Sequence, residues 1–368
     1  MKPILVVNSG SSSLKYQVVD VDTDEALFQG AIERVTDHAV AFEKMLSELV
    51  ASKVEPVAVG HRVVHGGAKF SKPTLVTDVV IAEIEKLIPL APLHNPGNLE
   101  GIKAAIKAFP GLPQVAIFDT AFHQSMPESS WRYAIDNNLA DKHGIRKYGF
   151  HGTSYAFVAN RTAKFLAKKL TELNAVIMHL GNGASICAVK NGESFDTSMG
   201  MTPLPGLVMG TRSGDIDAGL ALYLERVAEM DVNQVDHLLN AESGMLGLTG
   251  LVDMRDIAEK AAAGDARSSV ALEIYSERIR QYLGGYIARL GAVDAIVFTA
   301  GVGENSSVVR QMVCANLSVL GIEIDEVKNL EQEQIAREIS TDTSRVKVLV
   351  VPTNEELEIA KQTAALLN

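Results

Sequence analysis

Polar residues that stand beside glycines form seven short blocks, and these blocks hold most of the residues that could do chemistry. Each block combines histidine, arginine, asparagine or an acid with small neighbours, which is typical of turns that approach a ligand closely. Most of the nine histidines fall within the blocks, and this shared setting indicates functional loops rather than scattered structural residues. The blocks are Gly60–Gly67, Pro92–Asn95, Phe118–His123, Gly149–Thr153, His179–Gly183, Gly210–Asp215 and Gly301–Asn305.

Arg62 and Arg212 are the leading catalytic candidates in these blocks, in the contexts G-H-R and G-T-R-S-G. A guanidinium group stays charged and binds carboxylate or phosphate through two parallel hydrogen bonds. Phosphoryl transfer depends mainly on positioning and on stabilising charge, and a carboxylate acceptor is already ionised at neutral pH. The residue types therefore suit transfer of a phosphoryl group to a small acid. The alternative is that either arginine forms a surface or interdomain ion pair.

The usual nucleotide and hydrolase motifs do not occur. The sequence has no G-x-x-x-x-G-K-[ST], no G-x-G-x-x-G that opens a helix, no G-x-S-x-G and no H-E-x-x-H. If ATP binds, another arrangement must hold its phosphates.

Composition excludes several classes of protein. The 368 residues carry a formal charge of −11, which argues against non-specific nucleic-acid binding. Cys187 and Cys314 are the only cysteines, so neither a disulfide framework nor a zinc cluster is credible. No apolar run is long enough to span a membrane, and the N-terminus lacks the apolar region of a secretory signal. We expect a soluble, cytoplasmic protein of two domains.

The apolar pattern predicts two similar sets of strands and helices. In the first half, strands are expected at Ile4–Val7, Leu14–Val19, Ala26–Ile32, Val57–Gly60 and Val115–Phe118, and helices at His38–Ser52, Asp78–Ile88 and Asn95–Phe109. In the second half, strands are expected at Ala175–His179, Ser185–Val189 and Ala295–Phe298, with a last helix from Asn354 to about Leu367. Asn95 is expected to cap its helix, with Pro96 in the first turn.

Two strand–turn–strand units resemble each other and occur in the same relative order. The turn after Val7 aligns with Leu180–Ala184, so that Gly10 falls over Asn182 and Ser13 over Ser185. A later strand ending at Asp119 is echoed by the strand before Thr299. Any two such units look alike, but two pairs in one order favour an ancient duplication. We expect two lobes that each present an anion-binding turn to a cleft.

These blocks, together with Asn8–Lys15 and Pro352–Glu356, resemble the acetate kinase family of the acetate/sugar kinase–Hsp70–actin superfamily. The similarity runs from Ile4 to about Glu358. It implies an α/β fold of two duplicated ribonuclease H-like (actin-like ATPase) domains with an active-site cleft between them. The expected domains are 1–122 plus 358–368, with the last helix packed back on the first lobe, and the nucleotide-binding domain 123–357. The segment 30–56 contains fewer residues than the family pattern suggests. Tyr155 stands where the family usually has histidine.

The resemblance implies the roles of the catalytic and metal-binding residues. Arg62 holds the acetate, Arg62 and Arg212 embrace the phosphoryl group, and His151 and Arg212 stabilise the transition state. Asp119 is an essential carboxylate near Mg²⁺, for which Mn²⁺ can substitute, and Asn8 and Glu355 lie in the metal's coordination shells. Helix capping is the alternative role for the acids, and it is the stronger alternative for Glu355.

The resemblance also implies the two substrate-binding sets. The acetate methyl group is expected in an apolar pocket of Val64, Leu93, Phe150 and Pro203, near His94 and His179. Valine at position 64 favours acetate, although one methylene discriminates by only about 1–3 kcal/mol. ATP is expected to contact Ser11, Ser13, Lys15, His179, Leu180, Gly181, Asn182, Gly183, Asp253, Met254, Arg255, Gly301, Val302, Gly303, Glu304 and Asn305.

Three functions are therefore compared at the level of sequence. The first is an acetate kinase that transfers the phosphoryl group directly, with a phosphoenzyme on Glu355 as the second mechanism. The second is a propionate or butyrate kinase of the same kind. The third is a non-catalytic ATP-driven clamp, which would not need Arg62, His151 and an apolar acid pocket together. The resemblance also implies a homodimer, without nucleic-acid or membrane partners.

Overall fold

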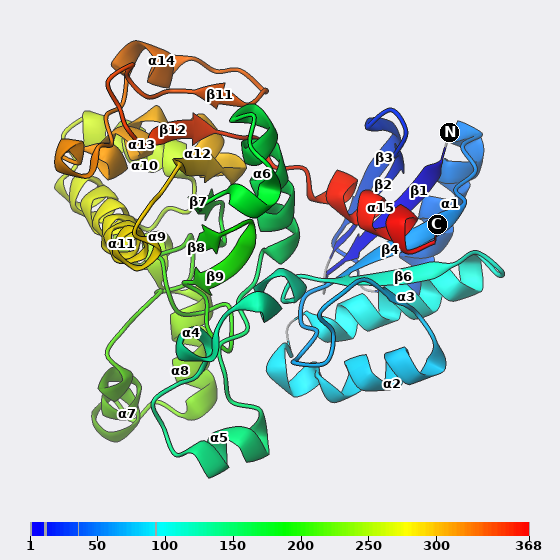
Figure 1. The fold of residues 1–368 in the computed structure, drawn as a ribbon. Coiled ribbons are helices and arrows are strands. Elements are labelled where there is room, and N and C mark those ends of the chain that lie inside the picture. Colours follow the sequence, from blue (N-terminus) through cyan, green and yellow to red (C-terminus); the bar gives the residue numbers. More distant parts are fainter. Residues whose placement is uncertain (1, 11–12, 36, 93, 368) are drawn as a thin grey trace. The chain divides into compact units, whose positions relative to one another are not determined.

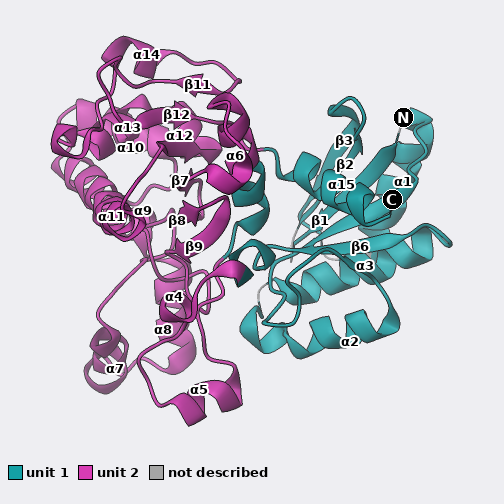
Figure 2. Ribbon diagram, in the orientation of Figure 1, with its two compact units in different colours: residues 1–124, 150–157, 354–368 teal, residues 125–149, 158–353 magenta. Residues whose placement is uncertain are grey.

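The computed structural model describes residues 2–10, 13–35, 37–92 and 94–367 (Figure 1). Ser11 and Leu93, two of the predicted site residues, lie outside the described residues. The chain forms two compact units (Figure 2). Unit 1 comprises Met1–Gln124, Phe150–Phe157 and Asn354–Asn368, and unit 2 comprises Ser125–Gly149 and Val158–Thr353. The division predicted from the sequence, with boundaries after residues 122 and 357, stays a prediction.

Unit 1 is built on a six-stranded sheet in the order β3-β2-β1-β4-β6-β5. Its strands are β1 (Pro3–Ser9), β2 (Ser13–Asp20), β3 (Glu25–Glu33), β4 (Ala58–Val63), β5 (Thr74–Leu75) and β6 (Gln114–Phe118). Its helices are α1 (His38–Ser52), α2 (Asp78–Lys86), α3 (Asn95–Ala108) and α15 (Glu355–Leu366), with a 3-10 turn η1 (Ile88–Leu90). The 3-10 turn η2 (Ala121–Ser125) and the helix α6 (Gly152–Phe165) begin in this unit and run into unit 2.

Unit 2 contains a second six-stranded sheet, in the order β11-β12-β10-β7-β8-β9. Its strands are β7 (Ala175–Leu180), β8 (Ala184–Lys190), β9 (Glu193–Thr197), β10 (Ala295–Thr299), β11 (Arg337–Glu338) and β12 (Lys347–Val350). Its first helices are α4 (Glu128–Trp131), α5 (Asn137–His143), α7 (Ala218–Val227), α8 (Val232–Ala241) and α9 (Gly244–Thr249). The remaining elements are α10 (Met254–Ala262), α11 (Ala266–Leu290), α12 (Ala300–Asn305), α13 (Ser307–Cys314), α14 (Glu326–Leu330) and the turns η3 (Leu170–Glu172) and η4 (Ser318–Leu320).

The two sheets have the same topology, which confirms the predicted duplication. Read from the other edge, the second sheet is β9-β8-β7-β10-β12-β11, and every neighbouring pair has the direction of its counterpart in the first sheet. β1–β4 and β4–β6 are parallel, as are β7–β10 and β10–β12. In both units the carboxyl ends of three parallel strands therefore meet at one edge, where ligands of α/β sheets bind.

Side chains alternate between the faces of the first sheet, and this alternation separates α1 from α15. Val59 joins a core with Phe42 and Met45 of α1. The neighbouring Gly60 faces the other way, where a Cβ atom would lie 2.5 Å from the Thr363 hydroxyl of α15. α15 therefore packs on the first sheet, and Gly60 is needed for its close approach. No described helix is both long and apolar enough to cross a membrane.

Local signals place most helix ends, with one exception. The Asp37 carboxylate accepts a hydrogen bond from the Ala39 N–H at 2.8 Å and begins α1, and Asn354 begins α15 in the same way through the Leu357 N–H. The predicted cap at Asn95 is wrong: His94 is the N-cap of α3, and Asn95 is already helical. The Asn95 amide instead holds His65, accepting from its N–H and donating to its carbonyl, both at 3.1 Å. The Asn95 side chain therefore bonds to the backbone of the distant residue His65 instead of capping its own helix.

Candidate functional site

Arg62 lies between two carboxylates at the strand-end edge of unit 1. It occupies β4 near the carboxyl end, and Asp119 directly follows the neighbouring strand β6. The Arg62 Nη2 atom donates to Asp119 Oδ2 at 2.7 Å, and Nε donates to both carboxylate oxygens at 3.1 Å. Glu355, in the first turn of α15, approaches Arg62 Nε at 3.7 Å. The structure thus brings together three residues that are far apart in the sequence.

Burial sets the protonation tendencies of this cluster. Asp119 is 1% exposed, and burial disfavours its anion more than Arg62 favours it, so the pKa of Asp119 is raised above the usual 3.8. Burial also raises the pKa of Glu355, with Arg62 opposing and Glu356 adding to the shift. Burial disfavours the Arg62 cation, but Asp119 and Glu355 outweigh it and raise the pKa of Arg62. Two acids and one arginine leave an excess negative charge that a cation would neutralise.

The residues of this cluster fit a magnesium ion that also binds phosphate. Mg²⁺ prefers one or two carboxylates and otherwise keeps phosphate oxygens and waters. Asp119 and Glu355 supply two carboxylates, and Asn8 stands one residue beyond the last β1–β4 pair, Val7 with His61. Glu355 is not needed as a helix cap, because Asn354 performs that role. Among the described residues, no group of three or more acidic, histidine or cysteine side chains could hold a metal alone. The metal would therefore depend on its nucleotide.

His151 has a backbone conformation that favours glycine. Its φ of +59° lies in the left-handed region, which costs free energy for a residue with a Cβ atom and is common at functional sites. The next residue, Gly152, donates its N–H to the Asp119 carbonyl at 2.9 Å, and a Cβ atom there would lie 2.3 Å from that oxygen. The backbone of His151 is thus fixed directly against that of Asp119.

Two further histidines and one amide hold the residues predicted to line the acid pocket. His123 Nε2 contacts the Phe150 carbonyl at 2.9 Å, and the His65 ring meets the Phe150 ring edge-on with centroids 5.6 Å apart. The Val64 N–H donates to Asn98 at 3.0 Å. Val64 and Phe150 are both buried in unit 1, whereas Pro203 belongs to unit 2. His94 lies near enough to Asp119 to favour its anion.

His61 and Tyr155 are structural. The His61 ring is buried and bonds to Gln114 at 2.8 Å, and burial lowers its pKa to about 4, so it is neutral at physiological pH. Tyr155 is fully buried, with its ring 5.5 Å from that of His123 and tilted at 70°. The tyrosine that replaces the expected histidine therefore supports the residue that holds Phe150.

Arg212 is the second arginine, and its setting in unit 2 is the opposite of that of Arg62. Its Nη1 donates to the Pro203 carbonyl at 3.0 Å, and within the described chain it forms no ion pair with a carboxylate. Burial lowers its pKa, as expected for a cation without a counter-ion. The Gly210 N–H before it donates to the Asn182 carbonyl at 2.9 Å, so this turn packs against the predicted phosphate turn. An uncompensated, partly buried guanidinium is suited to an incoming anion.

A cavity of about 830 Å³ in unit 2 collects many of the predicted nucleotide contacts. Eight of them line it: Gly181, Asn182, Asp253, Met254, Arg255, Gly301, Val302 and Asn305. Gly181 and Gly301 follow the parallel neighbours β7 and β10. Ala300, between β10 and Gly301, has a φ of +63°, so its backbone, like that of His151, lies in the left-handed region.

Other predicted nucleotide contacts are not on the wall of this cavity. Leu180 is fully buried in β7, and His179, Gly183 and Gly303 are not lining residues. Lys15 and Ser13 lie in β2 of unit 1, where the Gly10 N–H bonds to the Ser13 carbonyl at 2.8 Å and closes the turn. Asp253 and Arg255 line the cavity and also form an exposed ion pair at 2.6 Å, which lowers the pKa of Asp253 to about 2.

Glu304 stabilises the backbone beside the cavity. One oxygen of its carboxylate accepts from the Ala300 N–H at 2.7 Å and from the Thr353 N–H at 3.1 Å. Arg310 and Arg337 bind the Glu304 carbonyl from the other side. The side chain of Glu304 therefore fixes α12 to the residue that precedes Asn354.

Sequence reasoning missed the apolar wall of the cavity. Met245, Val252, Ala258, Tyr275 and Val308 line it, and they come from α9, α10, α11, α13 and the segment before α10. Apolar residues of this kind look like core in a sequence. The only available signal was that Val252 adjoins the predicted contact Asp253.

Comparison with known proteins assigns the fold to a family. A family model described as the acetokinase family matches residues 31–361. The chain belongs to the acetokinase family. It is 51% identical to an acetate kinase of Leifsonia xyli subsp. xyli, over 98% of each chain, and 51% identical to one of Clavibacter michiganensis subsp. michiganensis, over 99% of each.

Solved members of the acetokinase fold agree over the whole chain. A crystal structure of acetate kinase from Porphyromonas gingivalis matches with a TM-score of 0.96 and 41% identity, covering 100% of both chains. A propionate kinase from Francisella tularensis subsp. tularensis matches with a TM-score of 0.95 and 42% identity, covering 99% of this chain and 100% of that one. The predicted fold, two duplicated α/β domains of the acetokinase type, is thereby confirmed.

Proposed function

We propose that this protein is an acetate kinase, which reversibly transfers the γ-phosphoryl group of ATP to acetate and forms acetyl phosphate. The observation that carries the proposal is the pair of arginines in contrasting settings, Arg62 held by Asp119 and Arg212 without a carboxylate partner in the described chain. Membership of the acetokinase family and the names of its relatives support the same reaction.

Arg62 is proposed to bind the acetate carboxylate while it stays anchored to Asp119. Its Nε and Nη2 atoms bond to Asp119, whereas Nη1 makes no hydrogen bond to a described residue. A guanidinium that is fixed on one edge offers its other edge in a set orientation. Val64 is the second residue after Arg62 and Phe150 packs against the ring of His65, and these two buried side chains would receive the methyl group.

Arg212 and His151 are proposed to stabilise the phosphoryl group during transfer. Charge spreads over the equatorial oxygens of that group, and fixed donors that need no reorganisation stabilise it. The strained His151 backbone and the Arg212 turn packed on Asn182 both provide fixed positions. Arg62 and Arg212 belong to different units, so the proposed transfer uses residues of both.

Direct in-line transfer is the proposed route. An ionised acetate needs no base to activate it, so the protein has only to align it and neutralise charge. Asp119 and Glu355 would hold Mg²⁺ with the nucleotide phosphates, and the metal would supply charge neutralisation at the phosphate oxygens. A phosphoenzyme on Glu355 is disfavoured because Arg62 approaches that carboxylate and reduces its nucleophilicity.

We place the enzyme in the cytoplasm, where its proposed substrate ATP is available.

Homodimerisation is also part of the proposal. Helix α7 has no buried residue, yet Leu220, Leu222, Tyr223 and Val227 are 39–59% exposed on it. Val232, at the start of α8, is 67% exposed. Apolar surface of this extent marks a contact region, and a second copy of the chain would cover it.

A propionate kinase is the second candidate, supported by the structural match to the Francisella enzyme. Both candidates are tested by following ADP production from Mg-ATP with acetate, propionate, butyrate or no acid. We expect the highest kcat/KM with acetate and a lower value with propionate, because one methylene discriminates by about 1–3 kcal/mol. Arg62→Ala should lose nearly all acid-dependent turnover. ATP hydrolysis that needs no acid would contradict both candidates and favour the clamp.

A further inference from the structure

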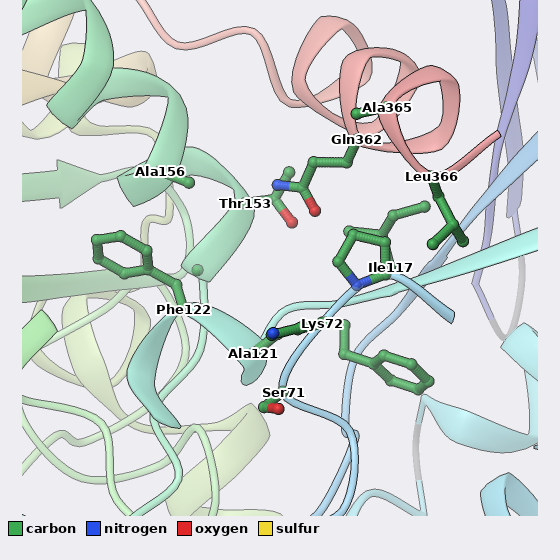
Figure 3. Close-up of a pocket in the computed structure, with 13 residues that line it drawn as sticks. Ser71, Lys72, Ile117, Ala121, Phe122, Thr153, Ala156, Gln362, Ala365 and Leu366 are labelled. Carbon is green, nitrogen blue, oxygen red and sulfur yellow. The ribbon is translucent and has the colours of Figure 1, made fainter. Parts of the chain in front are cut away.

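A second cavity, of about 450 Å³, lies entirely within unit 1 (Figure 3). Its walls come from the segment before β5, from β6, η2 and α6, and from the end of α15. None of the residues predicted to bind acetate, ATP or metal lines it. Nothing in the proposed reaction therefore uses this space.

The cavity borders elements of unit 1 that carry the proposed catalytic residues Asp119 and His151 and the proposed metal ligand Glu355. Its β6 lining, Ile117 and Phe118, directly precedes Asp119, and its α6 lining begins with Gly152, directly after His151. The Gly152 N–H is the group that bonds to the Asp119 carbonyl, at 2.9 Å. The third wall is α15, whose first residue is Glu355. A molecule in the cavity would touch each of these elements.

The lining combines an apolar body with a few polar groups. Ile117, Phe122, Ala365 and Leu366 supply apolar surface, and Figure 3 shows the Lys72 and Gln362 side chains facing the same space. Lys72 is exposed and forms no ion pair with any described residue, although the chain carries a formal charge of −11. An unpaired ammonium beside an apolar wall fits a ligand with one negative charge and an apolar tail.

Thr153 provides an independent indication of a ligand. Its side chain is 2% exposed, and its hydroxyl has no hydrogen-bond partner among the described residues. Leaving a buried hydroxyl unsatisfied is costly, and such groups are rare in native proteins. Thr153 and Gln362 both line the cavity (Figure 3), and the Gln362 amide donates to Glu358 at 2.8 Å. Because Thr153 lines the cavity, an acceptor atom of a bound ligand would satisfy its hydroxyl.

We propose that this cavity binds a small organic carboxylate with an apolar tail, and that its occupancy alters turnover at the catalytic groups. The carboxylate lies at Lys72 and the tail between α6, β6 and α15. The ligand acts through the Gly152–Asp119 backbone contact and through α15, not by competing with acetate. The effect on turnover rests on the proposed function, whereas binding does not.

The test uses hexanoate as the probe and hexylamine as the probe of opposite charge, with binding measured by calorimetry. Arg62→Ala is used as the background, because it removes the proposed acetate site and leaves the cavity intact. In that background we expect hexanoate to bind and hexylamine not to bind. Lys72→Gln should weaken hexanoate binding about three- to five-fold, the size that an exposed ion pair gives. Lys107→Gln, on α3 away from the cavity, is the matched control and should change nothing.

Ala365→Trp gives a second test, because Ala365 is exposed on α15 and a larger side chain fills the cavity from its mouth. We expect hexanoate binding to be lost while basal turnover with acetate is kept. In the otherwise wild-type enzyme, hexanoate should change kcat at saturating acetate, and Ala365→Trp should abolish this change. Hexanoate binding that Arg62→Ala removes, or that survives Ala365→Trp, would overturn the proposal. Acid-independent turnover with hexanoate binding intact would instead refute the proposed function alone.

Discussion

At the scale of single residues, the positive and negative side chains of the site are not paired one to one. Asp119 and Glu355 share one cation, Arg62, in a buried setting that disfavours both anions. Arg212 has no carboxylate partner in the described chain, and burial disfavours its cation. In the proposed function, a metal would neutralise the two acids and a phosphate would neutralise Arg212, so each disfavoured charge would gain a partner of opposite sign. The free protein is thus poised for its charged substrates.

Asp119→Asn should leave the fold at least as stable as the wild type at neutral pH while abolishing turnover. A carboxyl whose pKa is raised in the folded state stabilises the fold below its unfolded pKa, and this stability is lost as pH rises through the folded pKa. Asparagine does not titrate, so the melting temperature of the variant relative to wild type should rise as pH increases from below 3.8, the usual pKa of this carboxyl, to neutral. Thermal unfolding of the variant and the wild type, measured across that pH range, tests this prediction. A variant markedly less stable than wild type at neutral pH would contradict the assigned shift.

Arg212→Ala should lower kcat by about 10²–10³-fold, the usual effect of removing one fixed donor to transition-state charge. The KM for acetate should change little, because Arg62 is proposed to bind the acid. Steady-state kinetics measure the separation between kcat and KM. Arg267→Ala, an exposed arginine at the start of α11, is the matched control and should keep wild-type values. An equal loss in both variants would remove the special role of Arg212.

At the scale of elements, the two duplicated sheets explain why distant segments meet. Parallel strands β1, β4 and β6 end at one edge of the first sheet, and β7, β10 and β12 at one edge of the second. The sequence predicted most of these strands, because each is a short buried apolar run beside a glycine turn. The family resemblance assigned Arg62 and Asp119 to one active site, and the structure shows the physical basis: Arg62 lies near the end of β4 and Asp119 directly follows the neighbouring β6.

The parts that sequence did not predict depend on contacts between distant residues. Asn95 looked like a helix cap, but its amide bonds to His65 in the folded chain. Glu304 stays a predicted nucleotide contact, but its sequence context did not show that its carboxylate also accepts from the N–H groups of Ala300 and Thr353. The apolar wall of the nucleotide cavity, Tyr275 included, cannot be told from core by periodicity. In each case the deciding partner lies far away along the chain.

Glu304 should affect nucleotide binding through α12 rather than by contact. Glu304→Ala leaves the Ala300 and Thr353 N–H groups without this acceptor, and we expect weaker ADP binding together with lower stability. Glu304→Gln keeps a carbonyl oxygen in place, so its ADP affinity and its stability should both be close to those of the wild type. Calorimetric titration with ADP and thermal unfolding of the two variants measure this. A charge effect on the phosphates would instead make Glu304→Gln bind ADP more tightly than wild type.

At the scale of the whole molecule, the exposed apolar residues of α7 form the surface that we propose a second copy of the chain covers. Leu222→Asp together with Tyr223→Asp should convert a dimer into a monomer without unfolding unit 2, because both side chains are 55% exposed. Light scattering after size-exclusion chromatography gives the mass of each species. Glu225→Gln, also exposed on α7, is the control and should remain dimeric. A wild-type protein that is monomeric at all concentrations would contradict this part of the proposal.

The central claim is that the chain makes an acyl phosphate, and trapping that product tests it most directly. Mg-ATP and acetate are incubated with the protein in the presence of hydroxylamine, which converts acetyl phosphate to acetohydroxamate. We predict hydroxamate formation in step with ADP, dependent on acetate and nearly lost in Arg62→Ala. ADP formation without hydroxamate, at the same rate with and without acetate, would contradict the account.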